Sequence, residues 1–204
     1  MKEESILLLS DLQKLINQVV LIDYTIIILG GDLMDTEFNP TEILLIFGSN
    51  IRKSREMQGY TISDLAASIE YDRSCLSALE YGEQNIEYNT ALKLAQKLNV
   101  PFPDLFSRNY LNKLAKAKNG FLRTYKEDDY LLVFIENFKK DIQCKQIKQI
   151  EIYGATDIQT AMISRIINRK ALNPTIKTLY AMAYTVNTEM YSLFTRNTRE
   201  DEEI

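Results

Sequence analysis

The sequence predicts an all-α protein with two similar helical domains behind an N-terminal arm. Only seven Gly and four Pro occur among 204 residues, fewer than a β-sandwich or barrel needs for its turns. Residues 43–106 can also be laid over residues 130–194, so one sequence pattern occurs twice. A repeat of this length is a small domain that can bury its own core, since solenoid units are shorter.

The corresponding positions fall into two groups, because one residue is inserted part of the way along the second copy. At a shift of 87 the identical pairs are Leu44 and Leu131, Leu45 and Leu132, Phe47 and Phe134, Asn50 and Asn137, Lys53 and Lys140, and Ser77 and Ser164. At a shift of 88 they include Thr90 and Thr178, Ala95 and Ala183, Asn99 and Asn187, Leu105 and Leu193, and Phe106 and Phe194.

The composition is that of an ordinary soluble globular protein and argues against catalysis. The chain has no His, which is the commonest general base and metal ligand, and no GxSxG, HExxH or Walker-type glycine loop. Two cysteines, Cys75 and Cys144, are too few for a disulfide framework, and no secretory leader precedes them. We therefore expect a cytoplasmic protein without enzymatic activity, cofactor or metal.

Residues 1–38 form an acidic, apolar extension. Apolar side chains have helical spacing over residues 6–17, and the β-branched run over residues 19–29 predicts a strand. That run is interrupted by Asp23 and is too short to cross a bilayer, so no membrane partner is expected. An apolar segment outside both repeats must be buried. It either docks on the core or mediates dimerisation, and the sequence leaves both open.

The first repeat opens with a strong helix start. Asn39 at the N-cap, Pro40 at the first helical position and Glu42 at the third are typical of one. Gly59 ends this helix. The apolar stripe between them consists of Ile43, Ile46, Phe47 and Ile51.

Two short helices follow. Thr61 caps a helix over residues 63–69. Asp72 caps a second over residues 73–81, which Gly82 stops. The sequence therefore predicts two short helices joined by a tight turn.

The remaining boundaries follow the same logic. A helix over residues 90–98 ends before Pro101 and Pro103, which cannot continue it. The second repeat has the same order, with helix starts near Asp129, Lys148, Gln159 and Pro174. The expected organisation is an arm at 1–38, a first domain at 39–107, a linker at 108–128, a second domain at 129–195 and an acidic tail at 196–204.

Two short helices joined by a tight turn are the basis of a helix-turn-helix, whose second helix enters the major groove. The string GYTISDLAASIEYDRSCLSALEYG, residues 59–82, resembles the lambda-repressor-like, or XRE-family, helix-turn-helix. The resemblance extends over residues 43–106 and includes the Glu-x-Gly ending at 80–82. It implies core positions at Leu65, Ala66, Ile69, Leu76 and Leu79.

The second copy is similar to the same family over residues 164–183, SRIINRKALNPTIKTLYAMA. There Ile167 and Arg169 replace the Glu and the Gly of the ending, and the turn glycine is missing. The resemblance therefore implies two tandem lambda-repressor-like domains, the second degenerate.

The resemblance also implies which side chains contact DNA. In the first copy Arg73, Ser74, Cys75 and Ser77 would face base edges. In the second copy these would be Thr160, Ala161, Met162, Ser164 and Arg165, and the remaining expected contacts are Thr61, Arg169 and Lys170. Arg73 is the best candidate for specificity, since Arg can bind guanine with two hydrogen bonds. The alternative is that Arg73 pairs with Asp72 or Glu70 on an exposed face.

A structural pair is implied as well. In this family an Arg late in the first helix often pairs with the Glu that ends the third, here Arg55 and Glu80. The matching positions of the second copy hold Ile142 and Ile167. An ion pair and an apolar pair can fill the same buried slot, whereas a half-replaced pair would strand a charge. The joint exchange therefore supports the alignment.

Charge differs between the copies. Residues 58–90 contain six acidic side chains and Arg73 as the one basic side chain, whereas residues 145–178 contain six basic and two acidic ones. Phosphate contacts dominate nucleic-acid affinity, so the second copy has the better electrostatic footprint. We expect a transcriptional regulator that binds double-stranded DNA sequence-specifically as a homodimer. The alternative is a protein-interaction module, antitoxin-like or binding a regulatory partner, that uses the same fold without DNA.

Overall fold

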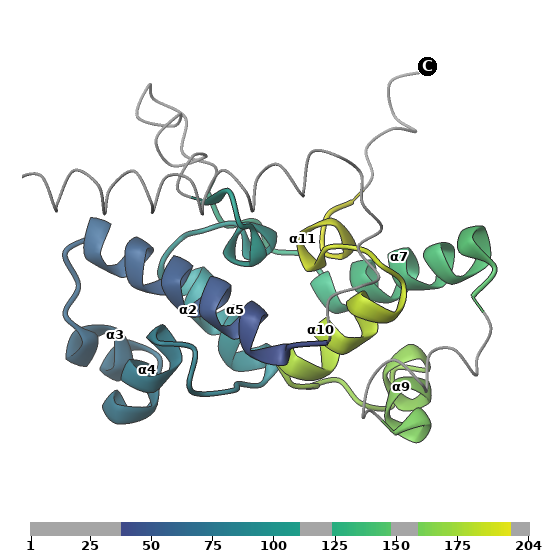
Figure 1. Cartoon of the computed structure of the whole chain (residues 1–204). Coiled ribbons are helices and arrows are strands. Elements are labelled where there is room, and N and C mark those ends of the chain that lie inside the picture. The colour runs from purple at the N-terminus through teal and green to yellow at the C-terminus, as the bar shows by residue number, and fades with distance from the viewer. Residues whose placement is uncertain (1–37, 111–123, 148–158, 197–204) are drawn as a thin grey trace, which may run out of the picture. The chain divides into compact units, whose positions relative to one another are not determined.

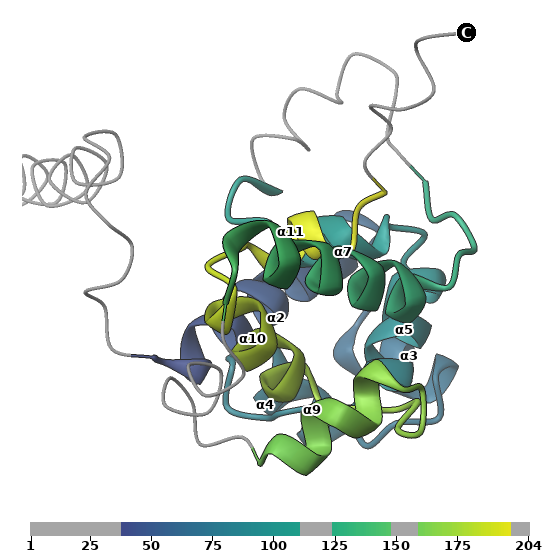
Figure 2. The same cartoon turned by 90° about the vertical axis from the view of Figure 1, so that its right-hand side faces the viewer.

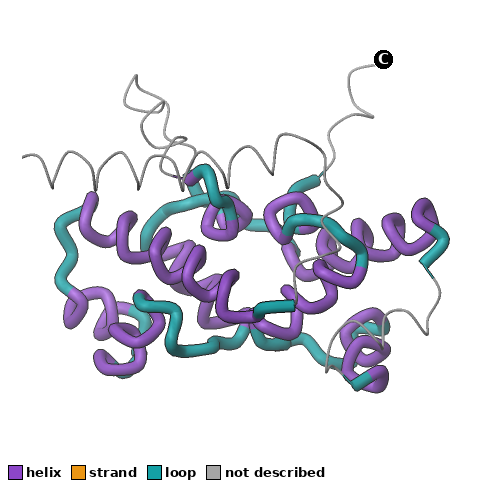
Figure 3. Tube along the Cα trace, viewed as in Figure 1, coloured by secondary structure: helices purple, strands orange, loops and turns teal. Residues whose placement is uncertain are grey.

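The computed structural model describes residues 38–110, 124–147 and 159–196. The regular secondary structure in these ranges is helical (Figures 1 and 3). No strand occurs in these ranges, so the expected all-α class is confirmed for them. The first part contains α2 (Pro40–Met57), α3 (Ile62–Ser68), α4 (Arg73–Glu80), α5 (Tyr88–Lys97) and the 3-10 helix η2 (Phe102–Phe106). The second contains α7 (Tyr130–Lys145), α9 (Thr160–Ile167), α10 (Ile176–Thr185) and α11 (Met190–Leu193).

Several sequence expectations lie outside the described residues. They are the helix and strand of the arm, most of the linker, the helix start near Lys148 and most of the acidic tail. All described residues belong to one unit of the chain, which begins at Phe38.

The capping residues begin the helices where the sequence predicts. Asn39 Oδ1 accepts a hydrogen bond from the Thr41 N–H at 3.0 Å, and Asp129 Oδ1 accepts one from the Leu132 N–H at 3.0 Å. Helix α5 differs, because it begins at Tyr88, two residues before the expected Thr90. Its N-cap residue, Glu87, makes no side-chain cap. The first N–H groups of α5 are bound from the second part instead, because Tyr88 donates to the Pro174 carbonyl and Asn89 to Asn173 Oδ1, both at 2.9 Å.

Left-handed backbone positions recur at the same shifts as the sequence matches. Gly59 and Gln146 have φ of 72° and 53°, and Asn99 and Asn187 have 48° and 47°. Gly82, with φ of 75°, corresponds to Arg169, with φ of 56°. The turn glycines of the first part are therefore replaced by bulkier residues, yet the turns keep their conformation at some cost in strain.

Two Asn side chains make the same contacts in the two parts. Asn50 Nδ2 donates to the carbonyls of Leu105 and Ser107 at 3.0 and 3.1 Å. Asn137 Nδ2 donates to the carbonyls of Leu193 and Thr195 at 3.0 Å each. In each part an Asn of the long helix thus holds the short C-terminal helix.

The two parts meet across an antiparallel bridge between Glu87 and Thr175. On one side of it the Tyr88 N–H donates to Pro174, and on the other the Ile176 N–H donates to the Ile86 carbonyl, both at 2.9 Å. Under the shift of 88, Tyr88 corresponds to Ile176 and Ile86 corresponds to Pro174. Each of the two hydrogen bonds is therefore the counterpart of the other, and the contact has approximate two-fold symmetry. Buried residues of both parts form one hydrophobic core, in which Phe106 stacks on its counterpart Phe194 with centroids 5.2 Å apart.

Candidate nucleic-acid interface

Helices α3 and α4 lie together beside α2 (Figure 1). The core positions implied by the resemblance are all buried, namely Leu65, Ala66, Ile69, Leu76 and Leu79. Helix α2 approaches the end of α4 at Gly48, where an added Cβ would lie 2.1 Å from the Leu79 carbonyl oxygen. Only Gly fits at this contact, which sets the position of α4 against the long helix.

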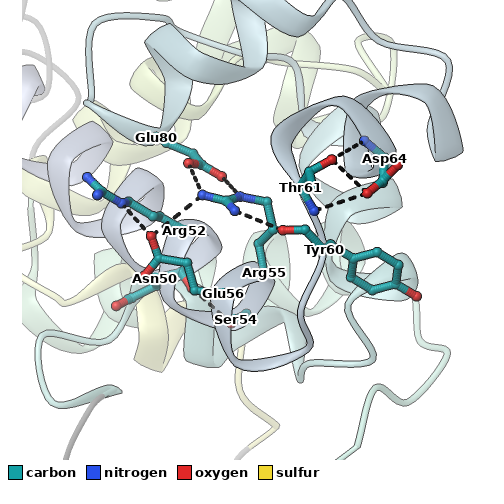
Figure 4. Close-up of polar contacts among 9 residues, drawn as sticks. All are labelled: Asn50, Arg52, Ser54, Arg55, Glu56, Tyr60, Thr61, Asp64 and Glu80. Atoms are coloured by element: carbon teal, nitrogen blue, oxygen red, sulfur yellow. Dashed lines mark hydrogen bonds and ion pairs between the residues drawn. The ribbon is translucent and has the colours of Figure 1, made fainter.

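The end of α4 is held by a buried ion pair between Arg55 and Glu80 (Figure 4). Arg55 Nε donates to Glu80 Oε1 at 2.6 Å and Nη2 donates to Oε2 at 2.9 Å. Nη1 donates to the Tyr60 carbonyl at 2.9 Å, on the segment leading to α3. The hydrogen bond to Glu80 raises the pKa of Arg55 above its ordinary value. One guanidinium therefore connects the last turn of α2, the entry to α3 and the end of α4.

The first turn of α4 is fixed by Asp72. Its Oδ1 accepts from the backbone N–H groups of Ser74 and Cys75 at 2.8 and 2.9 Å and from the Ser74 hydroxyl. The Ser74 hydroxyl and the Cys75 N–H hold the pKa of Asp72 below its usual range. The hydroxyl of Ser74 is thus already engaged, although its side chain is exposed.

Arg73 is the first residue of α4 and is exposed. Over the described ranges it forms no hydrogen bond or ion pair through its side chain, so the expected alternative of pairing with Asp72 or Glu70 does not occur. Cys75 and Ser77 are half-buried on the same helix. The charged group that α4 offers to a ligand is therefore the guanidinium of Arg73.

Thr61 has a capping role in the structure. Its Oγ1 accepts from the Asp64 N–H at 3.1 Å and donates to Asp64 Oδ2 at 2.6 Å, and the Thr61 N–H donates to the same oxygen at 3.2 Å (Figure 4). The Thr61 hydroxyl and backbone N–H lower the pKa of Asp64. The Asp64 carboxylate thus lies beside the Thr61 hydroxyl, which the sequence analysis expects to contact DNA.

In the second part, α9 exposes Ala161, Met162, Ser164 and Arg165 and buries Ile163 and Ile166. Thr160 is its first residue. Arg165 and Lys170 form no side-chain ion pair within the described residues and are exposed. Two basic side chains therefore remain available near this helix.

Arg169 is placed differently from the sequence expectation. Its Nη2 binds Asp129 Oδ2 at 2.8 Å, and the same Asp129 caps α7 with its other oxygen. The guanidinium is thus engaged within the protein. Asp129 and Arg169 lie at the positions of Glu42 and Gly82, and in the first part Gly82 packs against Leu45 of α2, so the turn after the second helix lies near the long helix in both parts.

The support behind α9 is also different. Ile142 and Ile167, at the positions of Arg55 and Glu80, are half-buried and pack on the core. Ile135 stands where the first part has Gly48. A side chain at Gly48 would collide with the Leu79 carbonyl, so α9 cannot approach α7 as closely as α4 approaches α2.

Residues 51–105 match the family model described as Helix-turn-helix. The match runs from the second half of α2 to η2, so the first part contains a helix-turn-helix domain. The family is one of DNA-binding regulatory domains and is not typically enzymatic. No curated protein and no solved structure was found to match the chain. Among the described helices, none combines the length and apolar character that a membrane span requires.

Proposed function

We propose that this chain is a sequence-specific DNA-binding transcription regulator that reads the major groove with α4. The observation that carries the proposal is Arg73, an exposed guanidinium without an internal partner in the described structure, on the first turn of the second helix of a helix-turn-helix domain. In this motif the N-terminal residues of the second helix contact base edges. Arg73 would bind guanine O6 and N7, and Cys75 and Ser77 would contact neighbouring bases. Ser74, whose hydroxyl donates to Asp72, would contact a base as an acceptor.

The support behind α4 favours this role. Gly48, Arg55 and Glu80 fix the helix against α2 without using any group on its exposed first turn. A recognition helix must be held firmly, because a base contact depends on hydrogen-bond geometry. The buried pair therefore positions Arg73 but does not itself meet DNA.

The second part would be a degenerate helix-turn-helix domain with α9 toward the groove. Thr160, Ala161 and Ser164 would lie near base edges, and Arg165 and Lys170 would attract phosphates. Arg169 would act indirectly, because its ion pair with Asp129 ties the turn after α9 to α7. Thr61 would contact at most the phosphate backbone of the DNA and no base, because its hydroxyl already donates to the Asp64 carboxylate.

One observation favours the alternative of a protein-interaction module. Glu70, Asp72 and Glu83 are exposed around α4, and Arg73 is the one basic side chain in residues 58–90. Such a surface repels phosphates and would suit a basic protein partner.

Selection from a random pool of duplexes separates the two functions. The intact protein is incubated with the pool at physiological and at reduced salt, and the retained fragments are sequenced. DNA reading by α4 predicts enrichment of a motif that contains guanine, and Arg73→Ala should lose the preference at that position. The control Arg108→Ala removes another exposed Arg, which lies outside the motif and pairs with Glu42, and it should retain the enriched motif. No enrichment at either salt would favour the interaction module.

A further inference from the structure

We infer that a single chain carries two DNA-reading heads, by which we mean the helix-turn-helix units that contain α4 and α9. These two helices of one molecule would engage one asymmetric DNA site without a second chain. This inference rests on the proposed function and deepens it. It replaces the homodimer expected from the sequence with a pair built into one polypeptide.

The first argument is the symmetry of the contact between the two parts. Beyond the two backbone hydrogen bonds beside the bridge, the Asn89 N–H donates to Asn173 Oδ1 at 2.9 Å and the Lys177 N–H donates to Asn85 Oδ1 at 3.2 Å. Asn85 and Asn173 correspond to each other under the shift of 88, and so do Asn89 and Lys177. The contact is therefore isologous, as in a two-fold dimer of identical subunits.

The second argument is that this pairing surface is filled. The ring centroid of Phe102 lies 4.9 Å from that of Phe194, in an edge-on contact, and 5.1 Å from that of Tyr130. Phe106 stacks on Phe194. All four rings are buried. An isologous interface closes on itself, so a second chain has no copy of this surface left to bind.

The third argument is the placement of the two heads. Figures 1 and 2 show α4 and α9 on the same side of this unit, while η2 and α11 lie toward the opposite side. Two-fold pairs of helix-turn-helix domains place their second helices in successive major grooves of one DNA face. Because both helices belong to one core, the second head is presented at a high effective concentration once the first has bound.

The fourth argument gives the kind of site. The residues of α4 that would face bases are Arg73, Ser74, Cys75 and Ser77, and their counterparts on α9 are Thr160, Ala161, Met162 and Ser164. Only the last pair is identical. Two different sets of side chains read different bases, so the two half-sites differ and the whole site is not a palindrome.

The experiment measures the mass of the complex and the spacing of the half-sites. The intact protein is mixed with the duplex enriched by the selection, and the complex mass is determined by sedimentation. We expect one chain per duplex over a site with two unlike halves. Inserting about five base pairs between the halves turns one of them to the other DNA face and should reduce the affinity about tenfold or more, whereas about ten should restore part of it. Two chains per duplex, a palindromic motif or indifference to the insertion would each overturn the inference.

A second variant tests the internal pair without DNA. Glu87 and Thr175 oppose each other in a non-hydrogen-bonded antiparallel position, where Cα atoms lie about 4.5 Å apart and a disulfide fits. Oxidised Glu87→Cys with Thr175→Cys should form this bond within a chain of monomer mass, as peptide mapping would show, and should bind the site as the reduced form does. Covalent dimers, or loss of binding on oxidation alone, would contradict the internal pair. If no duplex binds but the bond forms within one chain, the proposed function fails and the pairing of the two parts stands.

Discussion

The Arg55 guanidinium and the Glu80 carboxylate form a buried two-point ion pair, at 2.6 and 2.9 Å, where the second part of the chain has Ile142 and Ile167. Only 9% of the Arg55 side chain and 1% of the Glu80 side chain are exposed. The same slot is thus filled by opposite charges in one part and by apolar side chains in the other. Because a buried charge without a partner is costly, the two positions of each slot should change together.

Arg55→Ile alone should lower the free energy of unfolding by about 3–5 kcal/mol, because it leaves the Glu80 carboxylate buried without its cation. The double variant Arg55→Ile with Glu80→Ile should recover most of this unfolding free energy. It should not recover the part that comes from the hydrogen bond between Arg55 and the Tyr60 carbonyl, which the double variant also lacks. Urea unfolding of both single variants and the double variant gives the coupling energy. Additive effects at the two positions would contradict the role assigned to the pair.

Gly48→Ala should destabilise the protein by about 1–3 kcal/mol, since the new methyl group would collide with the Leu79 carbonyl and displace α4. Thermal unfolding checks the stability. The control Gly59→Asn enters open space, and Asn tolerates the left-handed conformation, so it should cost less than about 1 kcal/mol. Equal costs for the two variants would show that α2 and α4 do not pack closely at this point.

Asn50→Ala should cost about 1–3 kcal/mol of unfolding free energy, because the carbonyls of Leu105 and Ser107 lose a buried donor. Asn137→Ala removes the corresponding donor in the second part, where the side chain is only half-buried, and should cost less. Denaturant titrations of both variants provide the comparison. A larger loss for Asn137→Ala would contradict the equivalence of the two Asn side chains.

The sequence predicts local features of this fold well. Asn39, Thr61, Asp72 and Asp129 cap helices within their own first turns, and a cap depends on residues two or three positions away. The expected helix ends differ by a residue or so, as with α4, which ends at Glu80 instead of Tyr81.

Features that depend on distant parts of the chain are harder to predict. Helix α5 begins early because Tyr88 meets Pro174, and Arg169 is engaged because Asp129 lies beside it. Neither partner is near in sequence. The two-fold contact across Glu87 and Thr175 likewise follows only from how the two parts pack, although the sequence predicts two similar parts.

Replacing both Arg165 and Lys170 by Ala should weaken binding to all duplexes alike and reduce the slope of log K against log salt by about 0.9 for each phosphate that the protein no longer neutralises. Binding titrations at several salt concentrations measure the slope. The matched variant Arg169→Ala should change the slope less and the stability more, because this guanidinium already binds Asp129. If Arg169→Ala flattens the slope as much as the other two together, the ion pair does not persist on DNA.

The most direct test of DNA reading by α4 is titration of wild type and Arg73→Ala on the preferred duplex and on a scrambled one, at fixed salt. The Arg108→Ala variant serves as the control for removal of one exposed positive charge. Arg73→Ala should cost about 1–3 kcal/mol on the preferred duplex, relax the preference at one base pair and leave the scrambled duplex nearly unaffected. An unchanged ratio of affinities for the two duplexes would contradict base reading by the first part and support the protein-interaction module.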